Sequence, residues 1–176
     1  MGTVMDSSTS PETTAGPVPR DERLDTVAAQ TAAIDDLIGL AQHTLQVFDI
    51  DLSQTGWDTA VRANNLSAFL RRAPAARFEL ILHDTRWMES SCPRLLNLLT
   101  RYSPAITVYK TGPEARHAMD PLVIADGRHF LHRFHIDQPR ASLVIESPQL
   151  AGPLVTRFEE IWATGEPGVA GTLLGL

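Results

Sequence analysis

Apolar residues recur at helical spacing in several segments of the chain. Residues three or four apart lie on one side of an α-helix, so such segments predict amphipathic helices. Four of them are found: 24–44, 58–72, 92–102 and 150–164. In the last segment the stripe expected to face the core consists of Leu154, Val155, Phe158, Ile161 and Trp162.

Short apolar runs bounded by polar or turn residues predict strands. The runs are 45–50, 78–82, 106–109, 122–125, 128–134 and 141–146. Their alternation with helices indicates an α/β sandwich with a mixed, mostly parallel sheet flanked by helices. Asp126-Gly127 suits a tight hairpin turn, so the two strands that it joins are expected to be antiparallel.

The ends of the chain differ in composition from its middle. Residues 1–22 are rich in Ser, Thr, Pro and Gly, which predicts a disordered tail. Residues 23–165 are expected to form a single domain, followed by a Gly-rich, apolar C-terminal extension at 166–176. A chain of 176 residues is long enough for one hydrophobic core.

Charge and composition indicate which kinds of partner and which cellular location to expect. The formal net charge of −6 argues against a general nucleic-acid binder, although it is compatible with a local basic patch. A single cysteine and an N-terminus without an export signal favour the cytoplasm. We also expect no membrane span, because no apolar run approaches the roughly 18 to 20 residues that one needs.

The densest group of titratable residues is the segment 116–137, RHAMDPLVIADGRHFLHRFHID, which contains four of the six histidines. This segment, together with the order of the predicted elements, resembles one phospholipase D-like domain over roughly residues 24–164. Catalytic members of that family carry His-x-Lys-x4-Asp beside a strand. The resemblance implies a reaction in which the His attacks a phosphodiester, the Lys binds the phosphate, and two motifs form one site.

The motif is altered in this chain. Counting back from Asp126 places Met119 at the His position and Pro121 at the Lys position, and the chain has no second copy. The resemblance therefore implies a degenerate, non-catalytic motif. The segments FD-DLS, LHD, CPRL, IADGRH, RFHIDQPR and FEEIW are similar to those of an uncharacterised bacterial group of phospholipase D-like domains, which implies a bacterial origin and no defined activity.

Polar residues also flank the predicted strands where functional groups gather in α/β sheets. They are Asp49, Asp51, His83, Asp84, His117 and Asp120. These side chains could converge on one crevice that binds a small polar ligand, with Trp57 and Trp87 as walls. The alternative is that the aspartates cap helices and turns.

The segment HFLHRFH alternates as a strand does. Its first face carries His129, Leu131, Arg133 and His135. Arg133 and His135 could bind a phosphate there, or the face could simply be solvated. The other face is more apolar, which predicts that His132 is hydrogen-bonded in the core or at its rim.

Two classes of function follow. The first is a non-catalytic module that binds a phosphate-bearing small molecule or a protein partner. The second is a divergent phosphodiesterase or hydrolase, whose candidate catalytic residues are His117, Asp120, Asp126 and His135 with Arg133 nearby. A homodimer could rebuild a two-motif site, and an accessory domain of a larger enzyme is a further alternative. No cofactor is expected, and no metal, because His117, Asp120, His129 and His135 match no ligand spacing.

Overall fold

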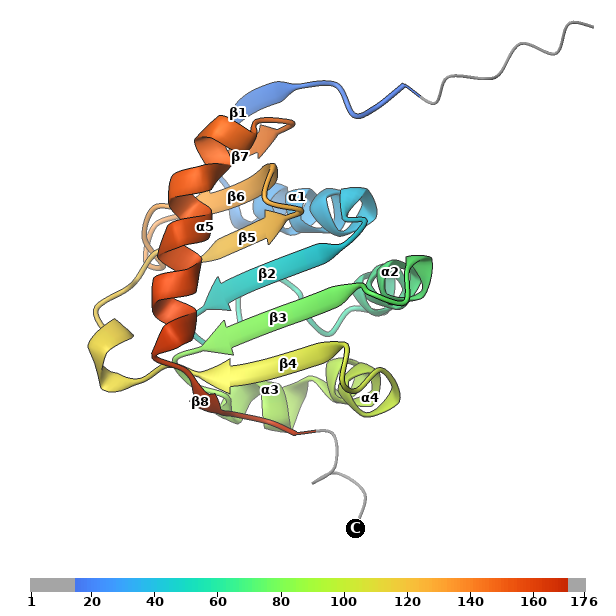
Figure 1. Ribbon diagram of the computed structural model, residues 1–176. Helices are drawn as coiled ribbons and strands as arrows, with labels where there is room; N and C mark the ends of the chain where they lie inside the picture. Colours follow the sequence, from blue (N-terminus) through green and yellow to red (C-terminus); the bar gives the residue numbers. More distant parts are fainter. Residues whose placement is uncertain (1–14, 171–176) are drawn as a thin grey trace, which may run out of the picture.

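The strands form one open sheet in the order β1-β7-β6-β5-β2-β3-β4-β8 (Figure 1). The computed structural model describes residues 15–170. The strands are β1 (Arg20–Leu24), β2 (Thr44–Asp49), β3 (Arg77–Leu82), β4 (Ile106–Lys110), β5 (Leu122–Ala125), β6 (His129–Arg133), β7 (Ala141–Ile145) and β8 (Glu166–Pro167). The helices are α1 (Val27–Leu40), α2 (Ala60–Arg72), α3 (Arg86–Ser91), α4 (Pro93–Arg101) and α5 (Pro148–Ala163), with a short 3-10 turn η1 (Pro113–Ala115).

The sheet is mixed, and the α/β sandwich predicted from the sequence is confirmed. Within residues 15–170, parallel pairing is confined to β2–β3 and β3–β4, whereas the other strand pairs are antiparallel. The expectation of a mostly parallel sheet is therefore wrong. Hairpin and edge pairings, which need no crossover helix, make up the larger share. The antiparallel hairpin between β5 and β6 turns at Asp126-Gly127, as predicted: both residues have positive φ, and the pairing of Ala125 with His129 leaves a three-residue connection.

Helices cover both faces of the sheet (Figure 1). Helix α5 packs on one face, and α1, α2 and α4 pack on the other, which gives three layers. Successive strand residues point to opposite faces: Val47 belongs to the core under α1 and α2, and Phe48 to the core under α5. None of the helices between residues 15 and 170 is long and apolar enough to cross a membrane.

Strands β1 and β8, helix α3 and the 3-10 turn η1 were not predicted. Strand β1 pairs with β7 and includes Arg20 to Glu22, which the sequence assigned to the tail. Its side chains are mostly exposed, so it carries no apolar pattern. Strand β8 pairs with the end of β4, within the expected C-terminal extension, and α3 is a short helix before α4. Residues 1–14 of the predicted tail and residues 171–176 of the predicted extension lie outside the described residues.

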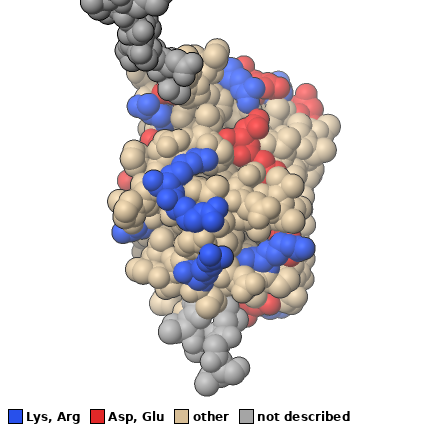
Figure 2. Space-filling view, turned by 90° about the vertical axis from the view of Figure 1, so that its right-hand side faces the viewer, with Lys and Arg blue, Asp and Glu red and all other residues tan. Residues whose placement is uncertain are grey.

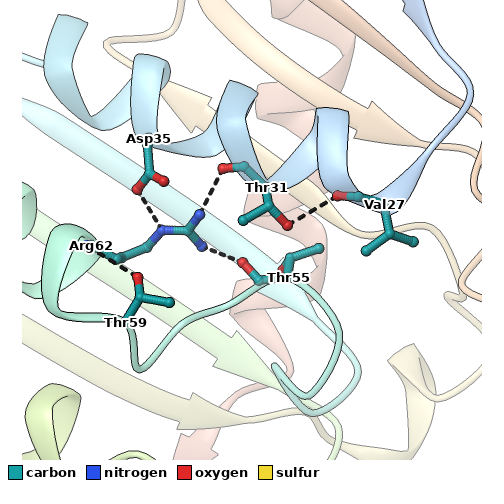
Figure 3. Close-up of polar contacts among 6 residues, drawn as sticks. All are labelled: Val27, Thr31, Asp35, Thr55, Thr59 and Arg62. Carbon is teal, nitrogen blue, oxygen red and sulfur yellow. Dashed lines mark hydrogen bonds and ion pairs between the residues drawn. The ribbon is translucent and has the colours of Figure 1, made fainter.

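A buried arginine ties α1, α2 and the β2–α2 loop together (Figure 3). The Arg62 side chain is fully buried, and its Nε donates to the Asp35 carboxylate on α1 at 2.8 Å. Its two terminal nitrogens donate to the backbone carbonyls of Thr55 and Thr31 at 2.7 and 2.8 Å. The guanidinium also lies over the Trp57 ring, 4.9 Å from the centroid. A buried charge of this kind is stable because each of its three nitrogens donates a hydrogen bond and one of them pairs with a carboxylate.

Candidate functional site

Most of the predicted site residues lie at one edge of the sheet, where β2 and β3 end. The register pairs Asp49 with Leu82, and it pairs the start of β5 with the end of both β2 and β6. We call this the carboxyl edge. The residues placed there are Asp49, Asp51, His83, Asp84, Asp120, His132, Arg133 and His135. The sequence thus identified the correct edge, but the sheet divides these residues between its two faces.

Asp126 lies at the opposite edge. The register pairs Ala125 with Leu45 at the start of β2. The Asp126 carboxylate accepts backbone N–H bonds from Gln42, His43 and Thr44 at 2.8, 2.8 and 2.9 Å. These hydrogen bonds hold the α1–β2 connection against the β5–β6 turn. Asp126 does not converge with the other candidate catalytic residues.

Arg133 is buried on the face covered by α1. Its guanidinium donates to the carbonyls of Gln138 and Ile136 at 2.8 and 2.5 Å, and to the Gln54 side-chain oxygen at 2.7 Å. His129 and Leu131, on the same face of β6, are buried as well. The part of the first face of HFLHRFH that lies in β6 is therefore buried, and each of the three Arg133 nitrogens donates to the protein itself.

Asp49 lies beside Arg133 on this buried face. Asp49 and Thr55 both line a cavity of about 20 Å³, which is too small for a ligand larger than a water molecule. Burial raises the pKa of Asp49 from 3.8 to about 6, despite a hydrogen bond from the Ile50 N–H and the charge of Arg133. The pair is thus part of the core and does not reach an open cleft. Trp57, one of the expected crevice walls, is also buried, and it stacks on Phe78 with centroids 6.2 Å apart.

His83 is a structural histidine on the face covered by α5. Its Nδ1 lies 2.6 Å from the Thr111 hydroxyl and its Nε2 lies 2.6 Å from the Ala118 carbonyl oxygen. The carbonyl can only accept, so Nε2 carries the proton and Nδ1 accepts from Thr111. Desolvation lowers the pKa of His83, which keeps the ring neutral. Neither nitrogen is left for a ligand.

Asp120 joins two side chains that sequence patterns did not connect. Its carboxylate accepts from the His132 Nε2 at 3.0 Å, from the Arg157 Nε at 2.8 Å and from the second Arg157 nitrogen. Burial alone would raise the pKa of Asp120, but the hydrogen bonds and charges of His132 and Arg157 outweigh it and lower the pKa to about 2. His132 is half-buried and hydrogen-bonded, as predicted. Arg157 was missed because it lies within an ordinary amphipathic helix pattern.

An open cleft of about 200 Å³ adjoins this cluster on the α5 face. It is lined by His117 and Arg157 together with Glu114 and Glu160. His117 is exposed and shares this cleft with Arg157, which also donates to the Asp120 carboxylate.

Three more of the predicted residues line a separate, shallow depression of about 340 Å³. Asp51, Asp84 and Trp87 line it with Arg86 and Ser90. Hydrogen bonds from Arg86 lower the pKa of Asp84 to about 2, and Asp51 accepts from the N–H and hydroxyl of Ser53. These bonds are the turn-stabilising contacts that the sequence had offered as the alternative to a ligand site.

His135 lies beyond the end of β6 and is partly exposed. Its Nδ1 accepts from the Asp137 N–H at 3.2 Å, and no contact with Arg133 brings the two together as a phosphate site. Within residues 15–170 no group of three or more His, Cys, Asp or Glu side chains is arranged to hold a metal ion.

Residues 26–170, most of the chain, match the family described as Domain of unknown function (DUF7931). The chain belongs to this family. A search of curated proteins finds no significant match to the DUF7931 domain.

Solved structures similar to the DUF7931 domain share its fold at low sequence identity. One is TrmBL2, an archaeal chromatin protein with a novel mode of DNA binding, at 11% identity and a TM-score of 0.66. The match covers 89% of this chain and 57% of TrmBL2, so the domain spans little more than half of that protein. Nuc from Salmonella typhimurium, a phospholipase D family member, is 11% identical with a TM-score of 0.60, and the match covers 87% of this chain and 100% of Nuc. NucT from Helicobacter pylori is 8% identical with a TM-score of 0.58, covering 86% and 100%. The fold of the domain is therefore phospholipase D-like.

Proposed function

We propose that this DUF7931 domain is a phospholipase D-like binding module that holds a phosphate-bearing ligand without hydrolysing a phosphodiester. The observation that carries the proposal is the place of Asp126. It is the one residue retained from the catalytic motif, and its carboxylate is held by three backbone N–H groups at the edge opposite His117 and Arg133. A carboxylate held in this way stabilises the fold and takes no part in chemistry at the carboxyl edge.

The two other motif positions support the same conclusion. Met119 and Pro121 stand where the nucleophilic histidine and the phosphate-binding lysine would be. Their carbonyls accept from the N–H groups of Ile136 and Arg133 and so fix the start of β5 to the end of β6. Thioether and pyrrolidine side chains offer neither a nucleophile nor a cation to a phosphate.

Phosphate recognition is the part of the ancestral function that survives such a loss most readily, because it needs only positioned donors. The fold is similar to that of a phospholipase D family member. Arginine supplies nearly all of the basic side chains, and its planar fork suits phosphate oxygens.

A second candidate is a divergent hydrolase that uses His117. It is favoured by one observation: His117 and Arg157 line the same cleft, with the Asp120 carboxylate behind Arg157. An imidazole and a guanidinium are the two groups that phosphoryl transfer requires. Against it, Glu114 and Glu160 line the same cleft and repel a phosphodiester.

Hydrolysis of bis(p-nitrophenyl) phosphate by the full chain separates the two candidates. We expect the release of p-nitrophenolate by the wild type to equal that of a His117→Ala variant and of a protein-free control. His43→Ala is the matched control, because His43 is another exposed histidine and lies at the opposite edge. Turnover by the wild type that persists in His43→Ala and is lost in His117→Ala would overturn the proposal and establish the hydrolase.

A further inference from the structure

Helices α2 and α4 leave a groove of about 410 Å³ between them on the outer surface. The lining residues are Ala60, Ala63, Asn64, Ser67, Arg94, Asn97, Leu98 and Arg101. On each helix they follow a spacing of three, one and three residues, so one side of each helix faces the groove. The small side chains on the α2 wall keep it open, and the long polar side chains come mainly from α4.

Charge distinguishes this groove from the two clefts near the carboxyl edge. Among residues 15–170 its lining includes Arg94 and Arg101 and no acidic residue, and Asp58, which pairs with Arg94, lies outside the lining. The cleft at His117 contains two glutamates, and the depression at Trp87 contains two aspartates. In a chain of net charge −6, this groove is therefore the one of the three that attracts an anion.

The groove also presents hydrogen-bond donors to solvent. The side chains of Asn64, Asn97, Arg94 and Arg101 are exposed, and no hydrogen bond within residues 15–170 occupies the two Asn amides. Arg94 contacts the Asp58 carboxylate through one nitrogen at 3.3 Å, which leaves its other terminal nitrogen available. Guanidinium and amide N–H groups are the side-chain donors that suit phosphate oxygens.

Basic side chains also lie beyond the groove, toward the C-terminal ends of the two helices that line it. Arg71 lies four residues after Ser67 on the same side of α2, and Arg101 lies in the last turn of α4. Figure 2 views the molecule from the side on which these helices end, and Lys and Arg side chains gather over its middle and lower part. Two of the arginines nearby, Arg72 and Arg77, donate to backbone carbonyls of Ala41 and Ala76, whereas no such contact occupies Arg71 among the described residues.

We propose that the α2–α4 groove binds a ligand that carries at least two phosphate groups. Arg94 and Arg101 are two helical turns apart, about 10 Å along the axis, with Asn97 between them, so a ligand with two or more phosphates can engage both arginines along the groove at once. The ligand chemistry is that of an oligophosphate, free or as part of a nucleic-acid strand. This inference rests on the proposed function and gives it a site away from the degenerate motif.

Titration of the ¹⁵N-labelled full chain with sodium tripolyphosphate, followed by NMR, tests the site. We expect the side-chain amide signals of Asn64 and Asn97 to shift, and binding to weaken as salt increases. Asn64→Asp adds a negative charge to the groove and is expected to weaken binding by about tenfold or more. Asn65→Asp is the matched control: it makes the same change at the next residue of α2, which does not line the groove.

Each result has a distinct meaning. Binding that weakens in Asn64→Asp and in Arg101→Ala, but not in Asn65→Asp, supports the groove. Binding that is equal in all variants, with shifts at His117 instead, overturns the groove and leaves the proposed function standing. Absence of binding of tripolyphosphate and of a short single-stranded oligonucleotide overturns both. Tighter binding of the oligonucleotide than of tripolyphosphate identifies a nucleic-acid strand as the source of the phosphates.

Discussion

The carboxylate of Asp126, at the end of β5, accepts a 2.8 Å hydrogen bond from the backbone N–H of His43, at the start of β2. With the bonds from the two neighbouring N–H groups, it joins segments more than 80 residues apart in sequence. Asp126 has positive φ, a conformation that Asp and Asn adopt more readily than other non-glycine residues. Asp126 therefore adopts the conformation that the β5–β6 turn needs, and its carboxylate holds the turn to the α1–β2 connection.

Asp126→Asn is predicted to destabilise the domain. Asn keeps the backbone preference, but its amide nitrogen faces an N–H where a carboxylate oxygen now accepts, and the charge of the remaining bonds is lost. We expect the free energy of unfolding in urea to fall by roughly 1–3 kcal/mol. Asp137→Asn, at an aspartate that is 80% exposed, is the control and should change little. Equal unfolding free energies of the two variants would show that the hydrogen bonds to the Asp126 carboxylate do not stabilise the fold.

Asp49→Asn tests the buried pair at the end of β2. Burial raises the pKa of Asp49 in the folded state above its value of 3.8 in the unfolded state, to about 6. The folded protein therefore holds this proton more tightly, and its stability falls as pH rises from about 4 to about 6. The side chain in the Asp49→Asn variant does not ionise, so its stability does not fall over this pH range. The unfolding free energy of the variant minus that of the wild type should therefore increase by roughly 1–3 kcal/mol between pH 4 and pH 7. A difference between the two proteins that does not change with pH, or that moves in the opposite direction, would contradict the assignment.

Arg62→Met removes the donor that joins α1, α2 and the β2–α2 loop (Figure 3). It leaves the Asp35 carboxylate and two buried carbonyls without their partner. We expect a loss of roughly 3–5 kcal/mol in the unfolding free energy, as for other broken buried pairs. Arg86→Met breaks an exposed Arg–Asp pair and is the matched comparison, with a much smaller loss. Similar losses from both variants would mean that burial of Arg62 contributes nothing.

The sequence predicted the elements that bury an apolar stripe. Helix α5 follows from its helical spacing of apolar residues, strands β2, β3 and β5 follow from short bounded apolar runs, and the Asp126-Gly127 turn follows from the conformations that its two residues tolerate. Strand β1 could not be predicted in this way. It lies at the sheet edge with exposed charged side chains, so its strand conformation comes from pairing with β7.

The site was only partly predictable, because partners distant in sequence decide what a polar side chain does. The alternation in HFLHRFH correctly placed His129 and Arg133 on one face, but carbonyls in the following loop determine that Arg133 is buried. Strand ends predicted the carboxyl edge, but not that His83 would be enclosed by Thr111 and Ala118. Arg157 has no local pattern to distinguish it, and its role follows from its contact with Asp120, 37 residues away.

The central claim is that the domain retains phosphate binding and has lost phosphodiester hydrolysis. The ³¹P NMR spectrum of a short single-stranded oligonucleotide with several phosphodiester linkages, mixed with the full chain, measures both at once. We predict that the phosphodiester resonance broadens or shifts on addition of protein, and that no phosphomonoester resonance appears on prolonged incubation. A growing phosphomonoester resonance that is absent with His117→Ala, or a phosphodiester resonance that the protein leaves unchanged, would contradict the account.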